Sequence, residues 1–218
     1  MKDLDFKVER MSTMYCASDL GFNVGYREQI VRLGKMLSRL GCTPPYTIPG
    51  WEGKGSHGNI SLRTEPGNKS KFVITATQTD LGNLQMSDVV EVVGSDEFTN
   101  PGERLERPIF RIVADTTRLP SSDTRVHQAL YEARIDVHCI IHGHDDWMLQ
   151  MADVLGFPQT RSSDLEDIVR LSSYNFFLIR GHGFVCLGKN ADLTVGTVIG
   201  RLHDVYRLYL ANRERLIK

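Results

Sequence analysis

Residues 136–148 read D-V-H-C-I-I-H-G-H-D-D-W-M, and the rest of the chain is best interpreted around this stretch. Its centre is an apolar run that predicts a buried strand ending at His142 and His144. Side chains alternate between the two faces of a strand, so these imidazoles should point the same way, with Cα atoms about 6.5 Å apart. Such a pair can bind one metal ion. Catalytic zinc usually takes about three protein ligands, so the third must come from elsewhere.

The best candidate for a third ligand is His182, which lies in the turn R-G-H-G. Glycines on both sides let the backbone approach another group closely and leave the imidazole unobstructed. A histidine in a glycine turn is more often an ordinary surface residue. Together with the H-x-H strand, however, a metal ligand becomes the preferred interpretation of His182. The remaining histidines are interpreted as structural: His57, His127, His138 and His203.

Length and composition indicate one domain over residues 1–218, with a possible N-terminal arm at 1–24. The chain has 26 Lys and Arg against 27 Asp and Glu, which gives no reason to expect a nucleic-acid or anionic-membrane partner. No apolar run approaches the ~20 residues that span a bilayer, and the N-terminus lacks a signal-peptide core. The four cysteines are widely spaced, so we expect free thiols in a cytoplasmic protein.

Helical and strand-like patterns alternate along the chain, which favours one layered α/β domain. The closing helix is longer than a domain of this size needs, so part of it is expected to form a subunit contact or an active-site lid. The pattern predicts helices over 26–40, through Val126, Leu130 and Ala133, and over 191–217. It predicts strands at 59–63, 72–75, 89–93, 109–113, 176–179 and 184–187, in addition to the run that ends at His142 and His144.

Polar residues cluster where the helix that contains Val126 should begin. A carboxylate at Asp123 could simply complement the helix dipole, or it could act as a general acid or base beside a metal. Likewise, the hydroxyls that precede it could cap the helix or, with free backbone N–H groups, bind a phosphate. These hydroxyls and the other candidate donors for a substrate are Gly58, Asn59, Thr77, Ser121 and Ser122.

Several motifs occur in a specific order: G-N-I-S, F-V-I-T-A-T, S-S-D-T-x-x-H, H-G-H and R-G-H-G-F-V-C-L-G-K-N-A-D. This ordered set, from about Tyr26 to the last helix, resembles the class II aldolase/adducin family. That family includes L-fuculose-phosphate aldolase, L-ribulose-5-phosphate 4-epimerase and the adducin head domain. The resemblance implies a three-layer α/β/α fold with a central mixed, mostly antiparallel sheet. It also implies a homotetramer with sites between subunits.

Matched position by position, the resemblance assigns roles to the candidates. His142, His144 and His182 correspond to the family's zinc ligands, although another divalent metal is possible, and Asp123 corresponds to its acid/base. The substrate phosphate would be bound by Gly58, Asn59, Thr77, Ser121 and Ser122. This chain departs from the family at Gln78, where the enzymes usually have a glycine. Asp164 is the candidate counterpart of a second aspartate in the epimerases.

The resulting hypothesis is a zinc-dependent, aldolase-type lyase. It would act on a small hydroxyketone or sugar phosphate through a metal-stabilised enediolate. One alternative is a sugar phosphate epimerase similar to L-ribulose-5-phosphate 4-epimerase. Another is a non-catalytic, adducin-like binding or scaffold domain, which retention of all three histidines disfavours.

Overall fold

The fold is built on one mixed sheet at the centre of the computed structural model, which describes residues 6–8, 17–47, 54–69, 71–100, 103–113, 118–162 and 164–216. Within these residues β1 and β9 pair in parallel with their neighbours, and the other pairings are antiparallel. The spatial order is β1 (Phe6–Val8), β7 (Glu103–Val113), β6 (Val89–Asn100), β5 (Phe72–Thr75), β4 (Asn59–Arg63), β8 (Cys139–Gly143), β11 (Gly183–Gly188), β10 (Phe176–Ile179) and β9 (Gln159–Thr160).

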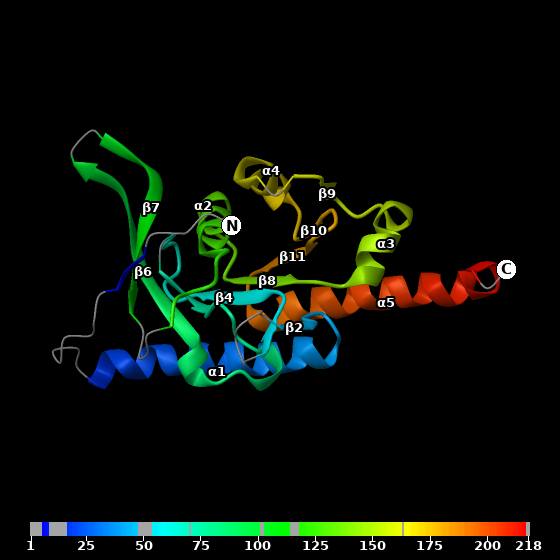
Figure 1. Ribbon diagram of the computed structural model, residues 1–218, viewed down its shortest axis with the longest axis horizontal. Helices are drawn as coiled ribbons and strands as arrows, with labels where there is room; N and C mark the ends of the chain where they lie inside the picture. Colours follow the sequence, from blue (N-terminus) through cyan, green and yellow to red (C-terminus); the bar gives the residue numbers. More distant parts are fainter. Residues whose placement is uncertain are drawn as a thin grey trace.

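Helices cover both faces of this sheet, as Figure 1 shows. On one face α1 (Ala17–Arg39), α3 (Asp146–Leu155) and α5 (Ala191–Leu216) share a core with alternate residues of the strands, such as Ile141. On the other face α2 (Thr124–Ala133) and α4 (Leu165–Arg170) pack on the intervening residues, such as Ile140. The expected three-layer α/β/α architecture with a mostly antiparallel sheet is therefore confirmed.

Short elements surround the central strands. A hairpin of β2 (Pro45–Thr47) and β3 (Lys54–Ser56), for which no strands were predicted, precedes β4. Three single-turn 3₁₀ helices, η1 (Leu81–Asn83), η2 (Met86–Asp88) and η3 (Leu171–Ser173), lie in the connections. The hairpin is important for function because it ends directly before the polar segment that runs into β4.

Several element boundaries differ from those expected. Helix α1 begins at Ala17, whereas the sequence pattern predicted a start at Tyr26. The predicted start was too late because the first turns of the helix carry little apolar periodicity. Residues 1–5 and 9–16 of the expected arm lie outside the described residues. Helix α3 was not expected. Its signals are local: the Asp145 side chain accepts a hydrogen bond from the Met148 N–H at 2.7 Å, and Gly156 ends the helix with φ +64°.

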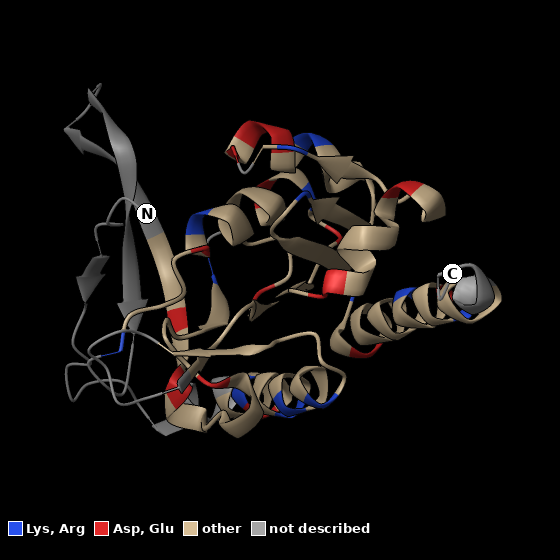
Figure 2. Cartoon of the chain, turned by 45° about the vertical axis from the view of Figure 1, so that its right-hand side comes forward, with Lys and Arg blue, Asp and Glu red and all other residues tan. Residues whose placement is uncertain are grey.

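The long closing helix has the expected extent. Asn190 caps it, since its Oδ1 accepts a hydrogen bond from the Leu193 N–H at 2.9 Å. Gly188 is required just before it, because a Cβ there would lie 2.1 Å from the Thr194 hydroxyl oxygen. Acidic and basic residues are interspersed over the described elements in Figure 2. None of the helices in the described part of the chain has the length and apolar character to cross a membrane.

Candidate active site

The centre of the site is the end of β8, in the middle of the sheet. In the strand register, His142 lies opposite Asn59 of β4 on one side and opposite Val185 of β11 on the other. Both neighbours pair with β8 through backbone hydrogen bonds, so the Cα position of His142 is fixed from two sides. The chain continues to His144, whose N–H donates to the Cys42 carbonyl at 2.7 Å.

Three imidazoles converge at this point: His142, His144 and His182. Their nitrogen ligand atoms all lie within 4.8 Å of one another, and the Nε2 atoms of His142 and His144 are 3.2 Å apart. The turn after β10 presents His182, so that its ring stacks on the His142 ring with a centroid distance of 5.0 Å. The two strand positions and the turn position predicted from the sequence are thus brought together.

Glycines allow this close packing of imidazoles. A Cβ at Gly183 would lie 2.3 Å from the Gly143 carbonyl oxygen and 3.0 Å from ring atoms of both His142 and His144. At Gly58 the backbone has φ +92°, and a Cβ would lie 2.5 Å from the His142 carbonyl oxygen. Any side chain at these positions would push the strands apart.

The donor set fits a divalent metal ion such as Zn²⁺. The His142 Nδ1–H donates to the Phe184 carbonyl at 2.8 Å, which leaves the Nε2 lone pair free for a metal. Burial lowers the pKa of His142, and burial with the neighbouring histidines lowers the pKa of His144 to about 3. Neutral imidazole is the form that binds metal. Three imidazole ligands would leave an open coordination position, as in catalytic zinc sites.

Asp123 faces the histidines from the start of α2. It occupies the N-cap position, but its side chain makes no capping bond; instead, Oδ2 accepts a hydrogen bond from the Asn59 Nδ2–H at 2.6 Å. Burial acts to raise the pKa of Asp123, but His142, His127, the Asn59 hydrogen bond and His182 hold that pKa below its ordinary value. Asp123 is therefore an ionised carboxylate beside the candidate metal ligands. An interaction with the helix dipole alone would not explain the hydrogen bond of Asp123 to Asn59 of β4.

A cavity of about 310 Å³ joins these groups. The three histidines, Asp123 and the five predicted substrate donors all line it, whereas Asp164 does not. The histidines and Asp123 form one part of its wall, and the polar donors form the rest. Asn59 is buried, and its Oδ1 makes no hydrogen bond with the described part of the chain. The predicted donors along the wall are Gly58, Asn59, Thr77, Ser121 and Ser122.

Among the lining residues that were not predicted as site residues, His57 and Gln78 bear most directly on the site. His57, interpreted as structural, stacks on His144 with a ring-centroid distance of 4.7 Å, and Tyr46 of the β2–β3 hairpin packs against the His57 imidazole at 4.8 Å. The only sequence signal was its position directly before Gly58-Asn59. Gln78 also lines the cavity, with φ +56°, which is the left-handed region that favours glycine.

His127 lies behind the site rather than in contact with Asp123 through its side chain. Its Nδ1 is 2.7 Å from the Ser61 hydroxyl, which is in turn 2.8 Å from the Tyr131 hydroxyl. Burial lowers the pKa of His127 to about 3, although the Asp123 carboxylate acts in the opposite direction. The buried network holds α2, and with it Asp123, against β4.

Other residues considered in the sequence lie away from the main cavity. Asp164 occupies the N-cap position of α4, and His203 is exposed on α5. His138 is half-buried, just before β8. None of these three is among the residues that line the 310 Å³ cavity.

Comparison with known proteins agrees with this geometry. Residues 49–165 match the family model described as Class II Aldolase and Adducin N-terminal domain. A curated relative, methylthioribulose-1-phosphate dehydratase from Gluconacetobacter diazotrophicus, is 24% identical over 209 residues, covering 81% of this chain and 88% of that protein.

Solved structures show the same fold. L-fuculose-1-phosphate aldolase from Thermus thermophilus superposes with a TM-score of 0.62 at 17% identity, covering 88% of this chain and 98% of that one. An aldolase II superfamily protein from Pseudomonas syringae gives a TM-score of 0.64 at 17% identity, covering 87% of this chain and 77% of that one.

Proposed function

Because the chain belongs to the class II aldolase and adducin N-terminal domain family, we propose that it is a metal-dependent lyase acting on a small hydroxycarbonyl compound. The observation that carries the proposal is one cavity in which three imidazoles converge beside a carboxylate whose pKa lies below its ordinary value. A non-catalytic scaffold would have no need to hold Asp123 ionised in this position. The preferred reaction is cleavage of a carbon–carbon bond, as in an aldolase.

His142, His144 and His182 would hold the metal, with Zn²⁺ the first choice. A divalent ion there supplies Lewis-acid polarisation of a substrate carbonyl. Asp123 exchanges a proton with the carbon next to that carbonyl, because its carboxylate is ionised and lines the same cavity as the imidazoles. Asn59 keeps Asp123 in place through the hydrogen bond from its Nδ2–H.

The polar end of the substrate would lie against the donors of the larger cavity. Ser121 and Ser122 precede α2, where backbone N–H groups and the helix dipole favour an anion such as a phosphate. Gly58 and Thr77 extend this wall. The Gln78 side chain stands where a phosphate would approach the backbone, so hydroxylated compounds with and without a phosphate are both substrates to test.

A second candidate reaction is the elimination of water from a similar substrate. It is favoured by the curated relative, which is named as a dehydratase. Both reactions remove a group from a carbon near a carbonyl, and both use a Lewis acid with a carboxylate acid/base. Epimerisation, which would use the same cleavage followed by re-formation of the bond, is the third outcome to distinguish.

The test combines metal analysis with product identification. Purified protein should contain about one divalent ion per chain, and His142→Ala should lose it while His203→Ala keeps it. The zinc-loaded protein would be incubated with L-fuculose 1-phosphate, L-ribulose 5-phosphate, methylthioribulose 1-phosphate and unphosphorylated ketoses. Proton NMR then separates aldehyde release, water elimination and a new stereoisomer. Wild-type protein that stays metal-free when zinc is supplied contradicts the proposal.

We also propose that the protein works as a homo-oligomer, with the tetramer implied by the family resemblance as the specific expectation. Support comes from α5, which extends beyond the body of the domain in Figure 1 and exposes Ile199, Tyr206 and Leu210. Light scattering coupled to size-exclusion chromatography would measure the mass. A protein that elutes as a monomer at micromolar concentration contradicts this part of the proposal.

A further inference from the structure

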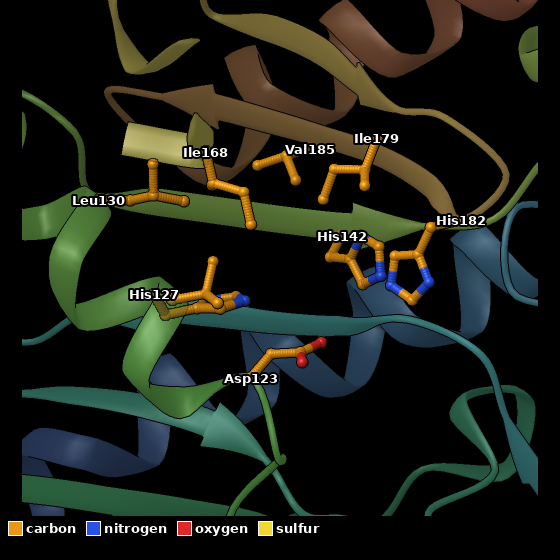
Figure 3. Close-up of a pocket in the computed structure, with 9 residues that line it drawn as sticks. Asp123, His127, Leu130, His142, Ile168, Ile179, His182 and Val185 are labelled. Carbon is orange, nitrogen blue, oxygen red and sulfur yellow. The ribbon is translucent and has the colours of Figure 1, made fainter. Parts of the chain in front are cut away.

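A second, smaller cavity of about 70 Å³ opens next to the candidate metal ligands, between the sheet and helices α2 and α4 (Figure 3). Its polar edge consists of Asp123, His142 and His182, which also line the larger cavity. The two cavities therefore meet at the candidate reacting centre. Aliphatic side chains form most of its remaining wall: Val126, Leu130, Ile168, Ile179 and Val185.

The two cavities have opposite chemical character. The larger one is rich in hydroxyl, amide and backbone donors, whereas the smaller one is lined mainly by branched aliphatic groups that are buried, apart from the partly buried Val126. Among the described residues along the smaller cavity, His127 is the one further polar group, and its Nδ1 is already bonded to Ser61. The low pKa that burial gives His127 keeps this ring uncharged near neutral pH. This wall therefore offers no stabilisation to a charged or strongly hydrated group.

The size of the smaller cavity limits what it can hold. A cavity of roughly 150 Å³ lined by aliphatic and aromatic groups holds benzene, and a water molecule in the liquid takes roughly 30 Å³. At about 70 Å³, this cavity matches two or three non-hydrogen atoms. Apolar cavities of this kind are poorly hydrated, so an apolar ligand group would displace little bound water.

We propose that the aliphatic cavity binds a short apolar tail of the substrate, two or three non-hydrogen atoms long, opposite the end held by the polar cavity. The substrate class is thus a hydroxycarbonyl compound with a polar end and a small alkyl or thioether end. This inference rests on the proposed function, because the hydroxycarbonyl group must be held between the cavities at the histidines. It goes further by naming the group on the far side of that centre.

Alkyl hydroxamates test the inference without requiring turnover. A hydroxamate chelates a metal ion through two adjacent oxygen atoms, as a hydroxycarbonyl compound would, and carries an alkyl tail of chosen length. Binding of acetohydroxamate, propionohydroxamate, butyrohydroxamate and hexanohydroxamate to the zinc-loaded protein would be measured by calorimetry. Each buried methylene should tighten binding about four-fold, from roughly 0.8 kcal/mol per CH₂. The gain should reach about 15-fold at butyrohydroxamate, and hexanohydroxamate should bind no better.

Variants of the aliphatic wall locate the tail. Val126→Phe should fill the cavity and make the affinities independent of tail length, whereas Val154→Phe, at an exposed valine of α3, is the matched control and should leave the series unchanged. Ile168→Ala should enlarge the cavity and move the best tail to hexanohydroxamate. This second variant decides the matter if Val126→Phe does not fold.

The outcomes separate this inference from the proposed function. A protein that binds zinc and hydroxamates but shows no dependence on tail length overturns the apolar subsite and leaves the metal-dependent function intact. A dependence on tail length that neither Val126→Phe nor Ile168→Ala alters also overturns it, because the tail then binds elsewhere. A protein that binds no zinc overturns both proposals.

Discussion

The carboxylate of Asp123 and the side-chain amide of Asn59 are joined by a 2.6 Å hydrogen bond that links the start of α2 to the central strand β4. Asn59 is also the cross-strand neighbour of His142. One amide therefore relates the position of the candidate acid/base to that of the first metal ligand, and the predictions below begin from it.

Replacing Asn59 with alanine should raise the pKa of Asp123, because the amide stabilises the charged carboxylate. The acid limb of the activity–pH profile should move to higher pH, and turnover should fall roughly 10- to 100-fold as the carboxylate loses its orienting partner. The carbon-13 shift of the Asp123 carboxyl group measures the pKa directly. Ser122→Ala is the comparison variant, expected to change KM rather than the pH profile. An unchanged Asp123 titration in Asn59→Ala would contradict the assigned hydrogen bond.

Removing the metal should destabilise the protein. A ligand at about 100 times its Kd stabilises the folded state by about 2.7 kcal/mol. For a chain of this length, that corresponds to a loss of roughly 5–10 °C in the melting temperature on chelation. Differential scanning calorimetry with and without a chelator measures the shift. His182→Ala should abolish the zinc-dependent part, and His203→Ala should retain it; an equal shift in both variants would place the metal elsewhere.

A methyl group at position 183 should be costly. Gly183→Ala would place a Cβ 2.3 Å from the Gly143 carbonyl oxygen, so we expect a loss of roughly 1–3 kcal/mol and weaker zinc binding. Gly196→Ala is the matched control in α5, where an added Cβ meets nothing within 4 Å; it should stabilise the helix by roughly 0.5–1 kcal/mol. Chemical denaturation measures both. Full stability and zinc affinity in Gly183→Ala would contradict the close packing of β8 and β11.

The stability of the metal-free protein should decrease as the pH is lowered, because of His127. Its folded-state pKa of about 3 lies below its ordinary value of 6.5, so the unfolded chain takes up the proton first as the pH falls. The stability contribution of the neutral ring is fully present above pH 6.5 and decreases by up to about 1.4 kcal/mol per pH unit toward pH 3. His127→Asn, which keeps a polar group near Ser61, should flatten this slope. Urea titrations from about pH 3 to 7 would show it; parallel slopes for both proteins would mean that His127 is not buried as a neutral ring.

The central strands were predictable because they carry local signals. The expected bounds of β4, β5 and β10 match the structure, since each is a short apolar run between turn residues. Helix α3 was missed because the residues after His144 were assigned to no element, although Asp145 and Gly156 are ordinary start and stop signals. The family resemblance is confirmed by the family model.

Within the candidate site, the positions of residues on strands and at helix starts followed from the pattern, and the position of His57 did not. Its location depends on the β2–β3 hairpin, whose Tyr46 packs against the His57 imidazole while that imidazole stacks on His144. Periodicity along one segment carries no information about such a contact between segments. The roles assigned to the site residues remain predictions for the experiments above.

Gln78 has a consequence for the balance between stability and activity. A side chain in the left-handed region costs roughly 1 kcal/mol or more relative to glycine, and this one stands at the cavity wall. Gln78→Gly should therefore yield a more stable protein with altered substrate preference. In directed evolution, a substitution at this position would change specificity and increase, rather than decrease, the stability of the folded protein.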